Sequence, residues 1–456
     1  MKNTLYHQLY EKLKKQIIEG QFKKDDKFYS KRQLSKHLSI SQTTVEHAYQ
    51  LLLDEGYIYS KPRSGYYVSE IESLSILHTH ATPVLDDILT PQSDNETYQF
   101  AFNLDEIDTK HFPIDLFRKY SKELYDQDYL NMLLRGHNQG EFQLRFQLAH
   151  YLFNNRGVIC NPDQIIIGSS TEQLVNLLVD LLSSSTFIIE KPSYPPIKHI
   201  LDKKNVTYDQ IKVEHNGINV DEVIKSKKNL VYITPSHQFP TGYVMDLKKR
   251  IQLIQWAKEK EERYIIEDDY DSEFRYFGKP IPSIQGLYSR DKVIYISTFS
   301  KSIFPSCRVA YMVLPTTLLE KYHLQNHIEG NTVPVHIQNL IAKFMSTGSF
   351  ERHLNKMRRI YRRKIAYIIQ RLKPYENQID IQGAETGMHF TITVLNGLSL
   401  QECINRAKSM NLKLQAYDFD DDLKQNSSPK FILGFGGIDD DDLKSHVDVL
   451  IKSLII

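Results

Sequence analysis

Hydrophobic positions near the N-terminus recur at the spacing of a helix. A predicted first helix within residues 5–22 gathers its apolar residues on one face: Leu5, Leu9, Leu13, Ile17 and Ile18. A second, shorter helix within 30–40 turns Leu34 and Leu38 inward, and Ser30 precedes it as a predicted N-cap. Two short amphipathic helices in succession indicate the beginning of a helix-turn-helix.

A third helix and a hairpin complete this predicted unit. The helix lies within residues 39–58, ends at Gly56, and turns four residues inward: Val45, Ala48, Leu51 and Leu52. Residues 57–70 place aromatic residues on both sides of a turn at 62–65, which predicts a β-hairpin with a basic tip. Three helices followed by such a hairpin are the pattern of a winged helix-turn-helix.

The rest of the chain alternates between two kinds of pattern. Five short, β-branched runs predict buried strands: 164–168, 186–190, 229–234, 264–268 and 292–297. Amphipathic stretches such as 171–182 and 246–260 lie between them and predict helices. This alternation indicates βαβ units and an α/β fold with a mostly parallel sheet. A charged helix over 349–372 then leads to a smaller α+β part with strands near 387–395 and 430–437.

Charged residues are distributed unevenly over the first hundred residues. Residues 1–70 hold twelve Lys and Arg against eight Asp and Glu, whereas 71–100 hold five acidic residues and no basic ones. The acidic stretch carries prolines, many hydroxyl residues and weak periodicity, so it is predicted to be a linker. The expected domains are therefore a DNA-binding domain at 1–70, a linker at 71–97 and an effector domain at 98–456.

The overall composition restricts which kinds of binding site and which cellular location we expect. The chain has 456 residues, 41% hydrophobic and 25% charged, with a net charge of +1, so affinity for nucleic acid must come from a local patch. Cys160, Cys307 and Cys403 are scattered, which argues against a disulfide framework, and we predict no metal site. No signal-peptide core or membrane-length apolar run is visible, so we expect a cytoplasmic protein without a membrane partner.

The N-terminal segment resembles the GntR family of bacterial regulators. The resemblance rests on Ser30-Lys31-Arg32, on "SQTTV" at 41–45 and on "RSGYYV" at 63–68. Hydroxyl groups at a helix start and cationic side chains suit DNA phosphates and base edges. The residues expected to contact double-stranded operator DNA are Lys31, Arg32, Ser41, Gln42, Thr43, Thr44, Arg63, Ser64 and Gly65. Gln42 stands where the family usually has Arg. Because Gln pairs with adenine whereas Arg prefers guanine, this residue favours adenine in the operator. A winged helix used for protein contacts is the alternative.

Lys301, in "STFSKSIFPSCRVAY" at 297–311, indicates the chemistry of the second part. Asp268 and Tyr270 lie at the end of a predicted strand, one helix and one strand earlier, where α/β sheets bind ligands. Pyridoxal 5′-phosphate (PLP) requires a lysine that forms a Schiff base and a carboxylate that keeps its ring nitrogen protonated. It also requires phosphate donors, and the candidates are Ser170, Thr171, Thr298, Ser300 and Arg308.

Residues 98–456 resemble fold-type I aminotransferases, and the whole chain resembles a MocR/GabR-type transcription regulator. The motifs that carry this resemblance are "TPSHQFPTG" (234–242), "EDDYDSEFRY" (267–276), "TFSKSIFPSCRVAY" (298–311) and "ERHLNKMRRIY" (351–361). It implies that Lys301 forms the Schiff base, Asp268 binds the ring nitrogen, Tyr270 donates to the phenolic oxygen and Tyr194 stacks on the ring. It also implies a head-to-tail homodimer.

Two departures from the family bear on the effector. Pro196 and Ile432 stand where an arginine that grips an amino-acid carboxylate is expected. Without such a clamp a substrate is poorly oriented, so we expect a regulator rather than an enzyme. PLP itself is then the expected effector, with vitamin B6 synthesis under control. Alternatives are an amino acid or peptide effector held by Arg135 or Arg275, an active aminotransferase, and a regulator that has lost the cofactor.

Overall fold

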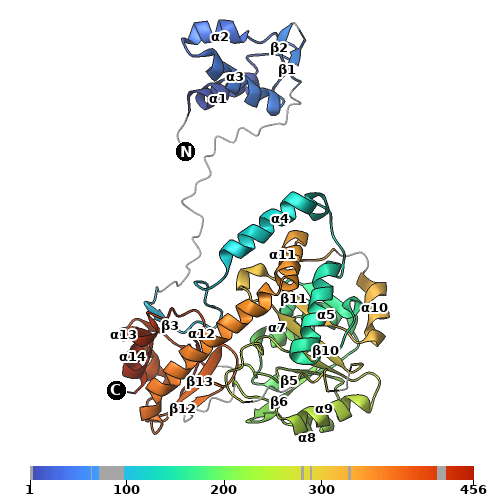
Figure 1. Ribbon diagram of the computed structural model, residues 1–456, viewed down its shortest axis with the longest axis vertical. Coiled ribbons are helices and arrows are strands. Elements are labelled where there is room, and N and C mark those ends of the chain that lie inside the picture. The colour runs from blue at the N-terminus through green and yellow to red at the C-terminus, as the bar shows by residue number, and fades with distance from the viewer. Residues whose placement is uncertain are drawn as a thin grey trace. The chain divides into compact units, whose positions relative to one another are not determined.

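The chain divides into two compact units, residues 1–95 and 96–456. A computed structural model, shown in Figure 1, describes residues 4–62, 64–70, 97–278, 282–287, 290–326, 330–417 and 428–455. The predicted linker at 71–97 lies outside the described residues except for its last position. Among the helices so described, none combines the length and the apolar character needed to cross a bilayer.

The first unit is a small helical fold with a hairpin. Its elements are α1 (Leu5–Ile18), α2 (Lys31–Leu38), α3 (Gln42–Asp54), β1 (Ile58–Lys61) and β2 (Gly65–Val68). The two strands pair antiparallel, which confirms the predicted hairpin. Val45, Ala48 and Leu52 of α3 are fully buried in a core that α1 completes. The prediction for Leu5 and Ile18 is wrong, because these residues at the two ends of α1 lie beyond the core and are exposed.

The second unit is built on an eight-stranded sheet of order β4-β11-β10-β9-β8-β5-β6-β7. Its strands are β4 (Ile165–Gly168), β5 (Phe187–Lys191), β6 (Tyr208–Glu214), β7 (Gly217–Ile218), β8 (Leu230–Ile233), β9 (Tyr264–Asp268), β10 (Val293–Thr298) and β11 (Ala310–Val313). The five strands from β10 to β6 run parallel, while β11, β4 and β7 pair antiparallel with their neighbours. The predicted mostly parallel sheet is confirmed.

Helices cover both faces of this sheet. One face packs against α6 (Thr171–Leu181), α7 (Pro195–Lys203) and α10 (Thr316–Asn326). The other packs against α8 (Val220–Lys225) and α9 (Leu247–Lys258). Successive residues of β9 serve opposite faces, as expected of a pleated strand buried on both sides: Ile265 belongs to the α9 side and Ile266 to the α6 side.

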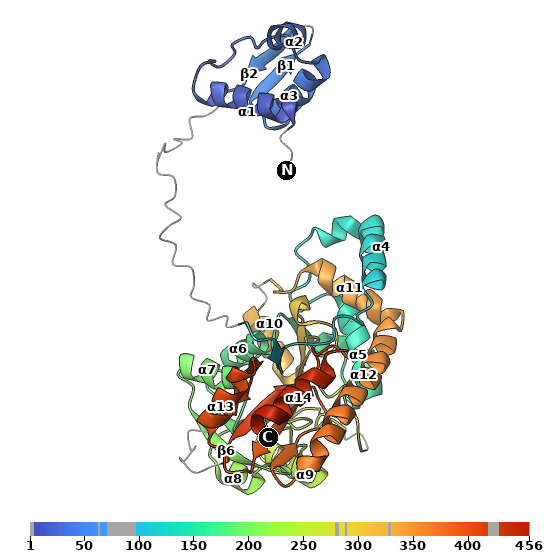
Figure 2. The same ribbon diagram turned by 90° about the vertical axis from the view of Figure 1, so that its left-hand side faces the viewer.

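The remaining elements form the smaller part of the unit and a group of long helices (Figures 1 and 2). The helices are α4 (Ile114–Met132), α5 (Phe142–Arg156), α11 (Val335–Ser346), α12 (Ser349–Leu372), α13 (Leu400–Ser409) and α14 (Leu443–Leu454). A second sheet joins β12 (Ile379–Gln382), β13 (His389–Val394), β16 (Lys430–Gly434) and β15 (Gln415–Ala416). In addition, β3 (Phe100–Ala101) pairs parallel with β14 (Leu412–Lys413), so residues far apart in sequence meet.

Candidate functional site

Several predicted site residues stand at the ends of strands. Asp268 is the last residue of β9 and Thr298 the last of β10, and these strands are parallel neighbours. Ser170 follows β4. Because β4 is antiparallel to β11 and β11 is antiparallel to β10, β4 runs in the same direction as β10. Tyr194 lies between β5 and α7. The carboxyl ends of these strands share one edge of the sheet, which is where open α/β sheets bind ligands.

A cavity of about 770 Å³ lies at this edge. All nine residues that were predicted to hold a cofactor line it: Ser170, Thr171, Tyr194, Asp268, Tyr270, Thr298, Ser300, Lys301 and Arg308. The volume lies within the range of about 300–1,000 Å³ that is usual for small-molecule sites. The geometry therefore gathers the predicted set in one place, from five separate stretches of sequence.

Lys301 is a sheltered amine in this cavity. Its Nζ donates a hydrogen bond to the backbone carbonyl of Leu104. Burial lowers the pKa of Lys301, and Asp105 and Asp271 counter that effect only in part. A lowered pKa leaves more of the amine neutral, and the neutral amine is the nucleophilic form that attacks a carbonyl carbon.

Asp268 is a buried carboxylate in the same cavity, with an unused acceptor. The hydroxyl of Tyr232 donates to its Oδ2, while its Oδ1 has no hydrogen-bond partner among the described residues. Burial raises the pKa of Asp268 to about 7. An unpaired buried acceptor is costly unless a ligand supplies a donor, so this residue fits a ligand that brings an N–H.

Another part of the cavity lining offers hydrogen-bond donors and a cationic side chain that could hold an anion. Ser170 is the N-cap of α6, and its Oγ accepts the N–H of Gln173 at 3.2 Å. Backbone N–H groups at a helix start favour anions such as phosphate. The hydroxyls of Thr298 and Ser300 lie 2.9 Å apart. Arg308 is exposed, and its guanidinium forms no hydrogen bond or ion pair with another described residue.

The two aromatic residues have hydrogen bonds of their own. Tyr194 donates to a carboxylate oxygen of Glu172 at 2.7 Å, which fixes its ring at the wall of the cavity. Tyr270 donates to the backbone carbonyl of His237 at 2.9 Å. Burial raises the pKa of both phenols well above the usual value, so both remain protonated donors.

A buried cluster at the cavity joins His237 and His389, which the sequence suggested only as neighbours of the pocket, to Asp271, which it did not single out. Nδ1 of His237 lies 2.8 Å from Oδ2 of Asp271, and the ligand-type atoms of these two residues and His389 all lie within 4.8 Å of one another. A side chain on Gly387, with φ +73°, would place its Cβ 2.0 Å from Nδ1 of His237. The three residues come from distant stretches of the sequence, so their spacing does not indicate the cluster.

The alternative carboxylate clamps are not in this cavity. Arg275 lines a separate cavity, and Arg135 is not among the residues that line either one. Pro196 does line the cavity, while Ile432 is fully buried in β16. Among the described lining residues, Arg308 is therefore the one arginine, and it lies beside the predicted phosphate donors.

In the first unit, the predicted DNA-contacting residues lie at the starts of α2 and α3 and at the hairpin turn. Five of the set are exposed, namely Arg32, Ser41, Gln42, Thr43 and Ser64, as is the backbone of Gly65. Lys31 and Thr44 are half-buried. Arg63 lies outside the described residues. The exposed set leaves the start of α3 open to a ligand.

The N-termini of α2 and α3 are capped by serine hydroxyl groups. Ser30 and Gln33 form a reciprocal capping box at α2, which confirms the predicted cap. Oγ of Ser41 accepts the N–H of Thr44 at 3.1 Å and lies 2.8 Å from its hydroxyl. Lys31 lies 3.6 Å from Glu46 and over the ring of Tyr66. These contacts fix the positions of α2 and α3 and occupy part of the predicted contact set.

Comparison with known proteins places both units. Residues 5–68 match the family model of bacterial regulatory proteins of the gntR family, and residues 105–415 match that of aminotransferase class I and II. The chain is 37% identical to the uncharacterized HTH-type transcriptional regulator YdeL of Bacillus subtilis, over 98% of this chain and 96% of that protein. It is 28% identical to the probable rhizopine catabolism regulatory protein MocR of Rhizobium meliloti, over 98% and 93%.

Two further similarities are more distant. The HTH-type pyridoxine biosynthesis transcriptional regulator PdxR of Corynebacterium glutamicum is 25% identical, over 96% of this chain and 93% of that protein. The crystal structure of Pyrococcus horikoshii kynurenine aminotransferase, solved with PMP, superposes with a TM-score of 0.68 at 22% identity, over 78% of this chain and 90% of that one. The chain therefore belongs to the MocR/GabR-type family of HTH transcription regulators, in which a GntR-type DNA-binding domain is joined to a domain of the aminotransferase class I and II fold.

Proposed function

We propose that the second unit binds PLP at Lys301 and that occupancy of this cavity by PLP itself changes how the winged helix binds operator DNA. The observation that carries the proposal is the pairing, in one cavity, of a half-buried amine of lowered pKa with a buried carboxylate that lacks a partner on Oδ1 among the described residues. Bound PLP would supply an aldehyde that a neutral amine can trap and a ring N–H that the carboxylate can accept.

Each residue of the lining then has a role in holding the cofactor. Lys301 would hold the aldehyde carbon and Asp268 the ring nitrogen, whose N–H replaces the missing partner. Tyr194 would lie against the ring, and Tyr270 would donate to its phenolic oxygen, exchanging its hydrogen bond to the carbonyl of His237. The phosphate would be held by the start of α6 and the nearby side chains, namely Ser170, Thr171, Thr298, Ser300 and Arg308.

The effector is proposed to be PLP rather than an amino acid. Arg308 is the one arginine among the described lining residues, and the phosphate would engage it. No second guanidinium then remains in that lining to orient an amino-acid carboxylate. The similarity to a regulator named for pyridoxine biosynthesis supports control of vitamin B6 genes. We propose that the protein performs this control in the cytoplasm.

The DNA-binding part of the proposal uses the exposed start of α3. Gln42 and Thr43 would reach base edges, while Arg32, Arg63 and the hydroxyls of Ser41 and Ser64 would contact phosphates. A homodimer with its units arranged head to tail would present two winged helices to repeated half-sites. Differential affinity of the two DNA-binding states for PLP would link the cavity to the operator.

Titration of operator binding decides the effector. DNA selected by the protein is bound in the presence of PLP, of single amino acids and of dipeptides, with the Lys301→Ala variant as control. We expect PLP alone to shift the DNA affinity, and the variant to lose that shift together with the absorbance band of the bound aldehyde. A response to an amino acid that needs PLP, or steady conversion of amino acids to keto acids, would contradict this assignment.

A further inference from the structure

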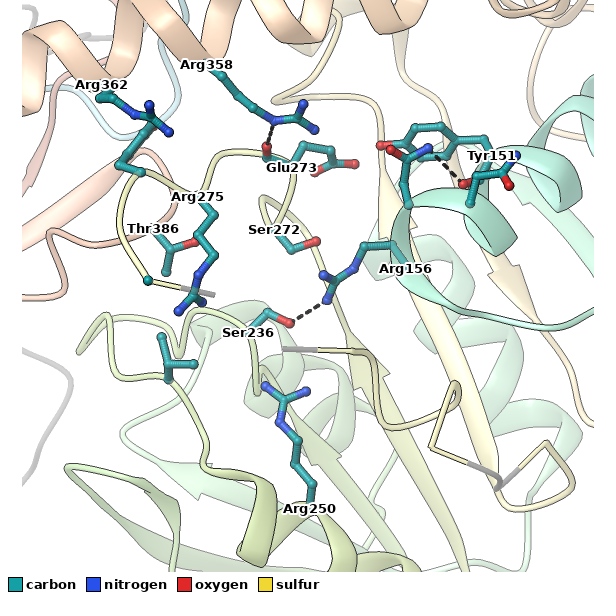
Figure 3. A pocket seen from close by; sticks show the side chains of 15 residues that line it. Tyr151, Arg156, Ser236, Arg250, Ser272, Glu273, Arg275, Arg358, Arg362 and Thr386 are labelled. Carbon is teal, nitrogen blue, oxygen red and sulfur yellow. Dashed lines mark hydrogen bonds between the residues drawn. The ribbon is translucent and has the colours of Figure 1, made fainter. Parts of the chain in front are cut away.

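A second cavity, of about 380 Å³, lies in the same unit and shares no lining residue with the first. Figure 3 shows the side chains that line it. Five of them are arginines, which come from α5, α9, the stretch after β9, and α12: Arg156, Arg250, Arg275, Arg358 and Arg362. The space is large enough for a small metabolite.

Two of the five guanidinium groups pair with acidic side chains. Nε of Arg156 lies 2.7 Å from Oδ2 of Asp269, and NH1 of Arg250 lies 3.8 Å from Oε1 of Glu267. Arg156 also donates to Oγ of Ser236 at 2.9 Å, as Figure 3 shows. These two arginines form part of the fixed wall of the cavity.

The other three guanidinium groups lie near weaker or neutral partners: Glu385 acts on Arg275 only at a distance that forms no ion pair, and Arg358 donates to the backbone carbonyl of Glu273 and to Oδ1 of Asn355. Arg275, Arg358 and Arg362 form no ion pair with any residue that the structure describes. Burial raises the pKa of Glu273, the one carboxyl group in the described lining, to about 8, so it is largely uncharged near pH 7. The described lining of the cavity therefore holds a surplus of positive charge.

Arg275 also has an unused donor. Its buried Nε has no hydrogen-bond partner in the described structure. Gly278, with φ +75°, leaves room for this side chain, because a Cβ at that position would lie 2.9 Å from NH2 of Arg275. Burial lowers the pKa of Arg275, in keeping with a guanidinium removed from water without a full set of acceptors. An anion in the cavity would supply the acceptor.

The two cavities lie back to back on the same three stretches of chain. Thr234 and Phe239 line the cofactor cavity and Ser236 the arginine-rich one. In the same way the stretch from Asp268 to Gly278 serves both, as do residues 386–389. Neighbouring residues of these stretches therefore face different cavities, and Asp269, the partner of Arg156, directly follows Asp268 in the chain.

We propose that this second cavity is a binding site for a small anion that carries two or more carboxylate or phosphate groups, held by Arg275, Arg358 and Arg362. Guanidinium groups recognise both oxyanions through paired N–H donors. An anion that draws Arg156 from Asp269 would also alter the setting of Asp268. This second effect, on PLP affinity, rests on the proposed function of the first cavity, whereas anion binding does not.

The test is calorimetric titration of the full chain with two probes, citrate for a polycarboxylate and inorganic phosphate. Arg275→Gln and Arg362→Gln are compared with Arg359→Gln, a control on α12 whose exposed side chain lines neither cavity. Arg308→Gln shows whether a probe binds in the cofactor cavity instead. We expect at least one probe to bind, with a loss of about tenfold or more in Arg275→Gln, in line with a charge-assisted hydrogen bond.

The outcomes separate the two proposals. Binding that Arg275→Gln and Arg362→Gln weaken, and that Arg359→Gln and Arg308→Gln leave intact, supports the second site whether or not PLP binds. Absence of binding by both probes at millimolar concentration overturns it, as does binding that only Arg308→Gln removes. The solvent-facing position of Arg362 keeps the test valid if Arg275→Gln disturbs folding.

Discussion

Replacing Asp268 by asparagine is expected to stabilise the protein without cofactor. The carboxyl is 4% exposed, and burial raises its pKa from the usual 3.8 to about 7. The raised pKa means that the folded state disfavours the ionised form. Asparagine has nearly the same shape, carries no charge, and keeps an oxygen that can accept from Tyr232. The variant therefore removes a penalty and retains the contact.

The size and pH dependence of this penalty follow from the two pKa values. Each pH unit between them corresponds to about 1.4 kcal/mol, so the ionised carboxyl destabilises the folded state by up to ~4 kcal/mol. The penalty is absent below pH 4, where the group is protonated in both states. It grows as the pH rises from about 4 to about 7 and is fully present above the folded pKa.

Urea unfolding of the cofactor-free chain at pH 5 and pH 8 measures this effect. Trp256 is the only tryptophan in the sequence and is buried on α9, so its fluorescence follows the second unit alone. We expect Asp268→Asn to raise the free energy of unfolding more at pH 8 than at pH 5. Asp115→Asn, which removes an exposed carboxylate, should change it by less than about 0.5 kcal/mol at both.

The expected gain reverses once PLP is added. The variant lacks a negative charge for the ring nitrogen, so PLP should stabilise wild type more than Asp268→Asn. If wild type is the more stable protein at pH 8 without cofactor, or if the stabilities of the two proteins show the same pH dependence, then burial does not disfavour the ionised form of Asp268.

Three further changes have defined outcomes. Lys364→Met removes the partner of the buried Asp108, 3.0 Å away, and should lower the free energy of unfolding by about 3 kcal/mol, seen as a lower urea midpoint. Gly387→Ala places a Cβ against His237 and should destabilise the second unit by about 2 kcal/mol or more, whereas an unchanged midpoint would refute that close approach. Gln42→Ala should weaken binding to the DNA sequence that wild type selects by about 1–3 kcal/mol, and an unaltered sequence preference would contradict base contact.

The alternation of apolar runs predicted the main sheet well because each central strand is buried on both faces. The run at 264–268 coincides with β9, and the helix at 349–372 coincides with α12. The short edge pairings escaped prediction. Two-residue strands such as β3 and β14 carry no period of their own and form only because the folded chain brings them together.

The candidate site was predictable as far as its motifs are local. Lys301 and Asp268 stand in stretches whose residue types match the chemistry of one cofactor, and the structure places both in one cavity. The carbonyl of Leu104 and the pair of His237 and Asp271 were not predicted. Their roles depend on distances across the fold, and neither the spacing nor the type of these residues indicates them.

The residues directly after strand β3, from Phe102 to Glu106, line the cavity that contains Lys301. The start of this unit is held by the pairing of β3 with β14. A few residues later, the backbone carbonyl of Leu104 accepts a hydrogen bond from Nζ of Lys301. A ligand that engages that nitrogen would free the carbonyl of Leu104, and so would act directly on the segment by which the chain enters this unit.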